Sequence, residues 1–301
     1  MTRVRESLQK FYTENDYWVL PVIKAITAFL CFFTVNSNIG YSDMLSNPLI
    51  CIAASILCSF LPWTCIPVFF SMLILGNAYA GSLEIFLVAG IVLLLAALIQ
   101  STFRAGNAIL IALVPLFFYI HIPYVIPIIA GLSLGLMSTV PVSIGVMLYY
   151  LIEYISVNAS LSKIAIGTDI TAMATAYAGL FGNLFKDKEI IITMAAFAFC
   201  IVIVFIISQI SFESNWIVAV IVGVISIIII SVCGYMHFEL DFSLFGILPG
   251  LIVSCLISLL YVFAFHAVDY QRTERLRFED DDYIYYVKAI PKLKSLDEDE
   301  N

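Results

Sequence analysis

The sequence predicts an all-α polytopic transmembrane bundle of eight to ten spans, with the N and C termini inside and a short C-terminal cytoplasmic tail. Hydrophobic residues make up 62% of the chain, and the mean hydropathy is +1.04. Residues 17–266 carry only fourteen charged side chains. A soluble domain of this length needs a much larger charged surface, whereas helices in lipid are apolar all round. These observations indicate a multi-pass protein whose first partner is the bilayer.

Six apolar runs have about the length of one span, since ~20 residues cross ~30 Å of hydrocarbon. They are residues 17–35, 83–100, 140–155, 190–208, 216–233 and 242–266. We expect the first run to be a retained signal anchor, because no small-residue cleavage pattern follows it. Two further runs, residues 48–75 and 108–136, are too long for one simple span and are interrupted by prolines: Pro62, Pro67, Pro115, Pro123 and Pro127. Each is expected to form one kinked helix or two short helices.

The basic residues near span ends predict the orientation. They gather before the first span and after the last, at Arg3, Arg5, Lys10, Arg272, Arg275 and Arg277. Both termini are therefore expected in the cytoplasm, which requires an even number of spans. Arg104 falls inside with ten spans and outside with eight, so the positive-inside rule favours ten. Three lysines fall outside with either count, against the rule: Lys163, Lys186 and Lys188.

Five segments follow from this pattern. Residues 1–16 are a cytoplasmic N-terminus, and residues 17–155 are a first transmembrane group with proline-broken helices. Residues 156–189 mix small, polar and apolar side chains, which predicts an amphipathic or interfacial segment. Residues 190–266 are a second group of three spans. Residues 267–301 are an acidic cytoplasmic tail, whose strand-forming runs allow a small β-hairpin.

Polar residues near the proline breaks are the candidate substrate-binding residues: Asn77, Gln100, Asn107 and His121. A proline removes a backbone donor and frees a carbonyl group, and broken helices often build binding sites within membranes. The alternative is that the prolines only kink packed helices and that these side chains sit at headgroup level. The sequence leaves both interpretations open.

Ionisable residues inside the apolar runs are few. Lys24 is expected to extend to the membrane edge, and Glu153 to lie at a solvated helix end rather than to carry protons. His237, Glu239 and Asp241 allow a metal-ligand triplet, but a polar loop explains them equally well, so no metal and no cofactor is expected. The sequence contains no P-loop, HExxH or GxSxG motif, which argues against an enzyme.

The tail contains three closely spaced tyrosines, Tyr283, Tyr285 and Tyr286, which form either a partner-binding face or a contact with lipid headgroups. The run FEDDDYIYYVKAIPK at residues 278–292 resembles the tails of uncharacterised multi-spanning membrane proteins of Firmicutes. The resemblance implies a bacterial cell membrane and no particular activity.

Two main hypotheses for function follow. The first is a non-enzymatic membrane component that acts through a membrane or cytoplasmic protein bound to its tail, in cell-envelope assembly or as a subunit of a membrane complex. The alternative is a transporter or permease for a small or amphipathic substrate, with a site between the broken helices. A third hypothesis, an interfacial enzyme, depends on the triplet at residues 237–241. Nucleic-acid binding is not expected, because no basic stripe exists to neutralise phosphates.

Overall fold

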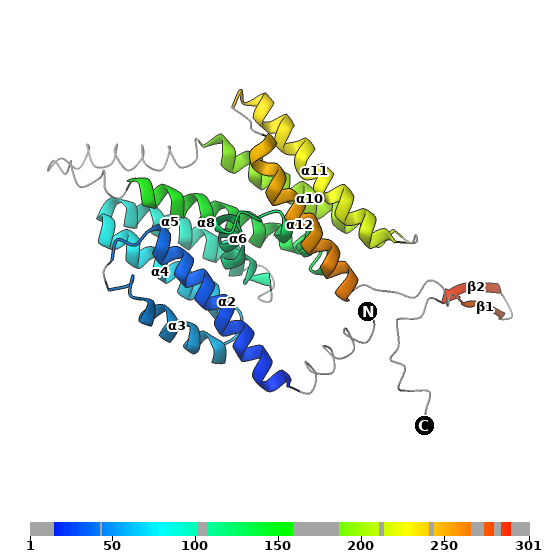
Figure 1. Cartoon of the computed structure of the whole chain (residues 1–301), viewed down its shortest axis with the longest axis horizontal. Coiled ribbons are helices and arrows are strands. Elements are labelled where there is room, and N and C mark those ends of the chain that lie inside the picture. The colour runs from blue at the N-terminus through cyan, green and yellow to red at the C-terminus, as the bar shows by residue number, and fades with distance from the viewer. Residues whose placement is uncertain are drawn as a thin grey trace.

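The computed structural model describes residues 15–42, 44–101, 107–158, 187–210, 214–240, 244–265, 274–279 and 284–289. Within these ranges the chain is a bundle of helices with one pair of strands (Figure 1). The helices are α2 (Asp16–Asn38), α3 (Pro48–Phe60), α4 (Cys65–Gly81), α5 (Leu83–Ser101), α6 (Leu110–Tyr119), α7 (Val125–Ser133), the 3-10 helix η2 (Leu136–Ser138), α8 (Thr139–Asn158), α10 (Lys188–Gln209), α11 (Asn215–His237) and α12 (Leu244–Phe265). The strands are β1 (Glu274–Glu279) and β2 (Ile284–Ala289).

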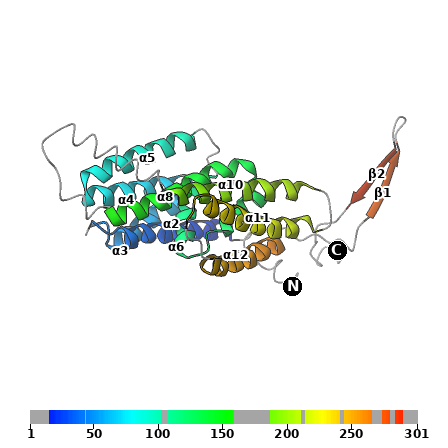
Figure 2. The ribbon, with the colours of Figure 1, turned by 90° about the horizontal axis from the view of Figure 1, so that it is seen from above.

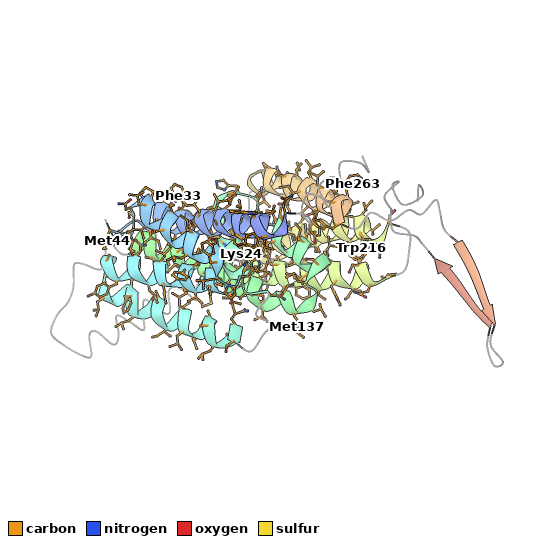
Figure 3. All side chains as sticks on the ribbon, turned by 90° about the horizontal axis from the view of Figure 1, so that it is seen from below. Lys24, Phe33, Met44, Met137, Trp216 and Phe263 are labelled. Atoms are coloured by element: carbon orange, nitrogen blue, oxygen red, sulfur yellow. The ribbon has the colours of Figure 1, made fainter. Side chains whose placement is uncertain are left out.

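Five of the described helices are long and apolar enough to cross a membrane: Tyr17–Asn38, Leu136–Val157, Lys188–Gln209, Asn215–His237 and Gly246–Phe265. They confirm a multi-pass, membrane-embedded helical bundle. The run at residues 83–100 is predicted as a full span and forms helix α5. The apolar part of α5, Ile85–Ser101, is shorter than the five long helices and is similar in this respect to the short apolar helices α3, α4 and α6. Carbon atoms dominate the outer surface in Figure 3, where Phe33 and Phe263 are each about half exposed.

Each proline-containing run forms two short helices. α3 ends at Phe60, because Leu61 is extended (ψ 163°) as the residue before a proline prefers, and α4 begins after Pro62. α6 ends at a corner, residues 120–124, where His121 adopts a left-handed conformation with φ 63°. Pro123 follows this corner, and α7 begins at Val125. The sequence allowed either one kinked helix or two short helices in each run, and the structure has two short helices in both runs.

The α6–α7 corner joins the two halves of the bundle. α6 packs beside α8, where a Cβ on Gly145 would lie 2.6 Å from Val114 Cβ, so only glycine permits this close approach. α7 instead packs into the second half with α10, α11 and α12, and a Cβ on Gly131 would lie 2.9 Å from a methyl group of Val204. The broken helix thus contributes one piece to each half.

α4 and α5 form an antiparallel hairpin around Ser82. Near this turn the ring edge of Tyr79 contacts Phe86, with ring centroids 5.5 Å apart. Among the described helices, only α4 and α8 make substantial contacts with α5. In Figure 2, α5 lies along one side of the bundle. Its outer face is an exposed apolar stripe: Leu87, Ile91, Leu94, Leu95, Leu98 and Ile99. α5 is therefore a peripheral helix with one face toward lipid.

Polar contacts mark the two ends of the bundle. At the end where α2 and α4 begin, Lys24 Nζ donates to the Leu61 carbonyl (3.2 Å) and lies 5.5 Å from the centre of the Trp63 ring. We call this the Trp63 end. At the opposite, Tyr41 end, the Tyr41 hydroxyl donates to the Ser156 carbonyl (2.6 Å). α12 ends at the same end of the bundle at which α2 begins (Figure 1).

Strands β1 and β2 pair antiparallel, with a register from Glu274 opposite Ala289 to Glu279 opposite Ile284. Figures 1 and 2 show the pair beyond the helices. Several predictions lie outside the described residues: the N-terminal segment 1–14, most of the interfacial segment (159–186), Arg104, Asp241, Tyr283 and the end of the tail.

Candidate functional site

A cavity of about 600 Å³ lies between α4 and α5, and α6 and α8 form its inner wall. Ligand pockets in proteins typically measure ~300–1,000 Å³. α4 and the residue before it contribute Thr64, Pro67, Val68, Ser71, Met72 and Leu75; α5 contributes Gly90, Leu93, Leu94, Ala96, Ala97, Gln100 and Ser101; the inner wall contains Ala108, Ile111 and Leu148. The cavity therefore lies beside the first proline break, between α4 and the unbroken helix α5.

Small side chains explain why α4 and α5 leave space between them. Gly90, Ala97 and Ser71 face the cavity, and a Cβ on Gly90 would meet only Leu75 Cδ2, at 3.9 Å. Because the hairpin is antiparallel, the wall residues of α5 run from Gly90 to Ser101, about 16 Å along the helix axis. The cavity is thus an elongated slot that ends at the Trp63 end of the bundle.

Gln100 is the distinctive polar group of this cavity. Both its side-chain oxygen and its side-chain nitrogen are buried, and neither has a hydrogen-bond partner within the described part of the chain. A buried polar group without a partner costs ~1–3 kcal/mol, so native proteins rarely retain one without a reason. Gln100 lies in the last turn of α5, close to the Trp63 end.

Two serine hydroxyl groups in the wall, unlike the Gln100 amide, have hydrogen-bond partners in the backbone. Ser71 Oγ donates to the Pro67 carbonyl (2.8 Å), and Ser101 Oγ donates to the Leu98 carbonyl (2.7 Å). Their hydrogens are thus committed to the backbone, and the oxygens remain as acceptors. The Gln100 amide can both donate and accept. None of the sixteen wall residues is ionisable, so the cavity suits an uncharged group next to Gln100.

The structure does not bring the four predicted substrate-binding residues together. Asn77 is 0% exposed and fully engaged at the opposite, Tyr41 end. Its Nδ2 donates to Asn36 Oδ1 (3.1 Å) and to the Leu73 carbonyl (3.0 Å), and its Oδ1 accepts from the Ser42 backbone (3.4 Å). Asn77 therefore holds the loop after α2 against α4.

Asn107 and His121 occupy two further places. Asn107 is buried directly before Ala108, which belongs to the inner wall of the cavity, but is not itself a wall residue. His121 is exposed in the α6–α7 corner, and a Cβ on Gly250 of α12 would lie 2.7 Å from its carbonyl oxygen. Of the four predicted residues, Gln100 alone lines the cavity.

Sequence reasoning missed the small residues that create the space. Gly90, Ala97 and Gln100 recur at a spacing that places them on one side of α5. A polar residue following two small residues on one helix face was a usable signal, although small residues in membrane helices more often mark close helix packing.

A second polar and aromatic cluster lies where α6, α8 and α10 meet. Phe118 stacks on Tyr149 with ring centroids 4.3 Å apart, and the hydroxyls of Tyr150 and Thr193 are 3.2 Å apart. Glu153 is exposed on the same helix as the tyrosines. Phe118 also stacks on Phe197 of α10, with ring centroids 5.8 Å apart, so aromatic rings from all three helices meet in this cluster.

The chain has no match among protein-family models, curated proteins or solved structures. The candidate site is therefore interpreted from its own geometry.

Proposed function

We propose that this chain is a non-enzymatic transporter or permease of the cell membrane that binds a small amphipathic molecule in the α4–α5 cavity. One observation carries the proposal: the wall of an apolar slot of ligand size includes Gln100, whose buried amide has no hydrogen-bond partner among the described residues. When the Gln100 side chain rotates toward the slot, a molecule that offers one acceptor and one donor to the amide removes its desolvation cost. The apolar wall adds ~25 cal/mol for each Å² of apolar ligand surface that it buries.

The path of the chain supports an even number of crossings, with both ends in the cytoplasm. α6 runs parallel to α8, since Val114 lies beside Gly145 and Phe118 stacks on Tyr149. α7 therefore returns toward the Trp63 end before α8 crosses again. Ser101 and Asn107, the described residues that flank Arg104 in the sequence, both lie at the Trp63 end. With this end inside, Arg104 obeys the positive-inside rule.

The proposal is tested by identifying the small molecules that co-purify with the protein. The protein is purified in mild detergent, small molecules are extracted with organic solvent, and the extract is quantified by mass spectrometry. Ala97→Trp places an indole in the slot, whereas Ala80→Trp places it on an exposed position of α4 outside the wall. We expect wild type and Ala80→Trp to retain an amphipathic molecule that Ala97→Trp lacks. Identical extracts from all three proteins would refute the proposal.

A second candidate function is a component that acts through a protein partner bound to the tail. The paired strands β1 and β2, which lie beyond the helices, favour it, since an isolated two-stranded hairpin is only marginally stable and gains from a surface to pack on. Deletion of residues 269–301 tests this function. It predicts loss of a co-purifying protein, whereas the same deletion should leave ligand retention unchanged if the transporter proposal alone holds.

A further inference from the structure

The α4–α5 slot opens toward the lipid-facing surface of the bundle. Three of its wall residues have large exposed fractions, Val68 with 52%, Met72 with 60% and Leu94 with 60%. Leu94 belongs to the exposed apolar stripe of α5, which is the outer face of a peripheral helix. In a bilayer these side chains contact acyl chains, and the slot between them is continuous with the hydrocarbon phase.

The inner part of the slot is closed to the surrounding lipid. Leu93 and Ile111 are each 5% exposed, and Leu148 is 0% exposed. These three side chains form the floor of the slot. A molecule that reaches the floor must have entered between α4 and α5, because neighbouring lipids can contact only the rim.

The polarity of the slot changes along its length. Thr64, Gln100 and Ser101 lie at the Trp63 end, and the wall toward Leu75 and Gly90 is almost entirely apolar. Tryptophan and extended lysine side chains typically sit at the level where hydrocarbon gives way to headgroups. Lys24 and Trp63 meet beside Thr64, so the polar end of the slot lies near this level.

From this arrangement we infer that the ligand is an acylated membrane lipid which enters sideways from the bilayer. Its acyl chain lies along the floor of the slot. Gln100 Nε2 is shielded by the protein, so the Gln100 side chain must rotate toward the slot before it donates a hydrogen bond to the ester or amide carbonyl that joins the chain to the headgroup. None of the described wall residues is ionisable, which fits this uncharged linkage and leaves the headgroup outside the slot. The inference deepens the proposed function by naming its ligand class, and it depends on the slot being a binding site.

Photolabelling tests the inference with the full-length protein in phosphatidylcholine vesicles. The probe is a phosphatidylcholine with a diazirine in one acyl chain, and labelled residues are located by peptide mass spectrometry. We expect labels on the floor residues Leu93 and Ile111, whose small exposed surfaces face the slot, in addition to labels from surrounding lipid on Leu95 and Ile99. Ala97→Trp should abolish floor labelling and leave Leu95 and Ile99 labelled, whereas Ala80→Trp should retain both.

An ether-linked probe with the same diazirine chain tests the role of Gln100. It lacks the carbonyl, so in wild type it should label the floor about two- to tenfold less than the ester probe, the ratio that one hydrogen bond accounts for. In Gln100→Leu the two probes should label the floor equally. Equal labelling by both probes in wild type would overturn the contact with Gln100.

An unlabelled floor beside labelled Leu95 and Ile99 would overturn the lipid inference as a whole. The proposed function would survive that result if solvent extraction still recovers another molecule that Ala97→Trp loses. Failure of both experiments would refute the binding site itself.

Discussion

Two buried amides in this bundle have opposite surroundings, and their replacement by leucine should change stability in opposite directions. Gln100 has two buried polar atoms with no partner in the described chain. Gln100→Leu removes their desolvation cost and fills the same space with an apolar side chain. We expect the ligand-free protein to gain about 1–3 kcal/mol in its free energy of unfolding, while ligand retention is lost.

Asn77 is the matched control, because its side chain makes three hydrogen bonds. Asn77→Leu loses them and leaves Asn36 Oδ1 without this donor. Side-chain hydrogen bonds within membrane proteins average ~0.6 kcal/mol each, and an orphaned buried group adds ~1–3 kcal/mol, so we expect a loss of about 3–5 kcal/mol.

The assay is thermal unfolding of delipidated protein in one detergent, followed by the fraction that remains monodisperse after heating. The melting temperature should rise by a few degrees for Gln100→Leu and fall by more for Asn77→Leu. A fall for Gln100→Leu as large as that for Asn77→Leu would refute the reasoning, because it would show that the Gln100 amide has a partner in the folded protein.

Three further predictions use the same thermal assay. Gly250→Ala should cost about 1–3 kcal/mol, because the new Cβ would lie 2.7 Å from a backbone carbonyl of the α6–α7 corner, whereas Gly90→Ala meets only ordinary contacts and should be neutral or stabilising; equal losses would contradict the tight packing of α12 on that corner. Tyr150→Phe removes the hydroxyl contact with Thr193 and should cost ~0.5–1.5 kcal/mol, and an unchanged melting temperature would argue that this contact is not a stabilising bond. Lys24→Met should cost ~0.5–2 kcal/mol through loss of its contacts with the α3 C-cap carbonyl and a tryptophan ring, and any gain in stability would contradict them.

The bundle could be predicted because hydropathy reports directly on the solvent around a helix. Each of the apolar runs at residues 17–35, 190–208, 216–233 and 242–266 corresponds to one long described helix. The sequence located the proline-containing runs but did not determine whether each forms one kinked helix or two short helices. Whether proline kinks or divides a helix depends on its neighbours, here the extended Leu61 and the left-handed His121.

The candidate site was harder to predict than the fold. Asn77 and Gln100 have similar sequence surroundings, each a polar residue in an apolar run near a proline. They differ because the loop after α2 folds back and supplies partners to Asn77, and no described segment does the same for Gln100. Satisfaction of a buried amide depends on residues distant in the sequence, which periodicity and composition do not reveal.

The central claim is that the α4–α5 slot holds an amphipathic molecule against Gln100. The most direct measurement is an experimental structure of the full chain in a lipid nanodisc, at a resolution that shows side chains in the slot. We predict elongated density between α4 and α5 that reaches hydrogen-bond distance of the Gln100 amide. A slot filled by the protein's own side chains, with the Gln100 amide bonded to them, would contradict the claim.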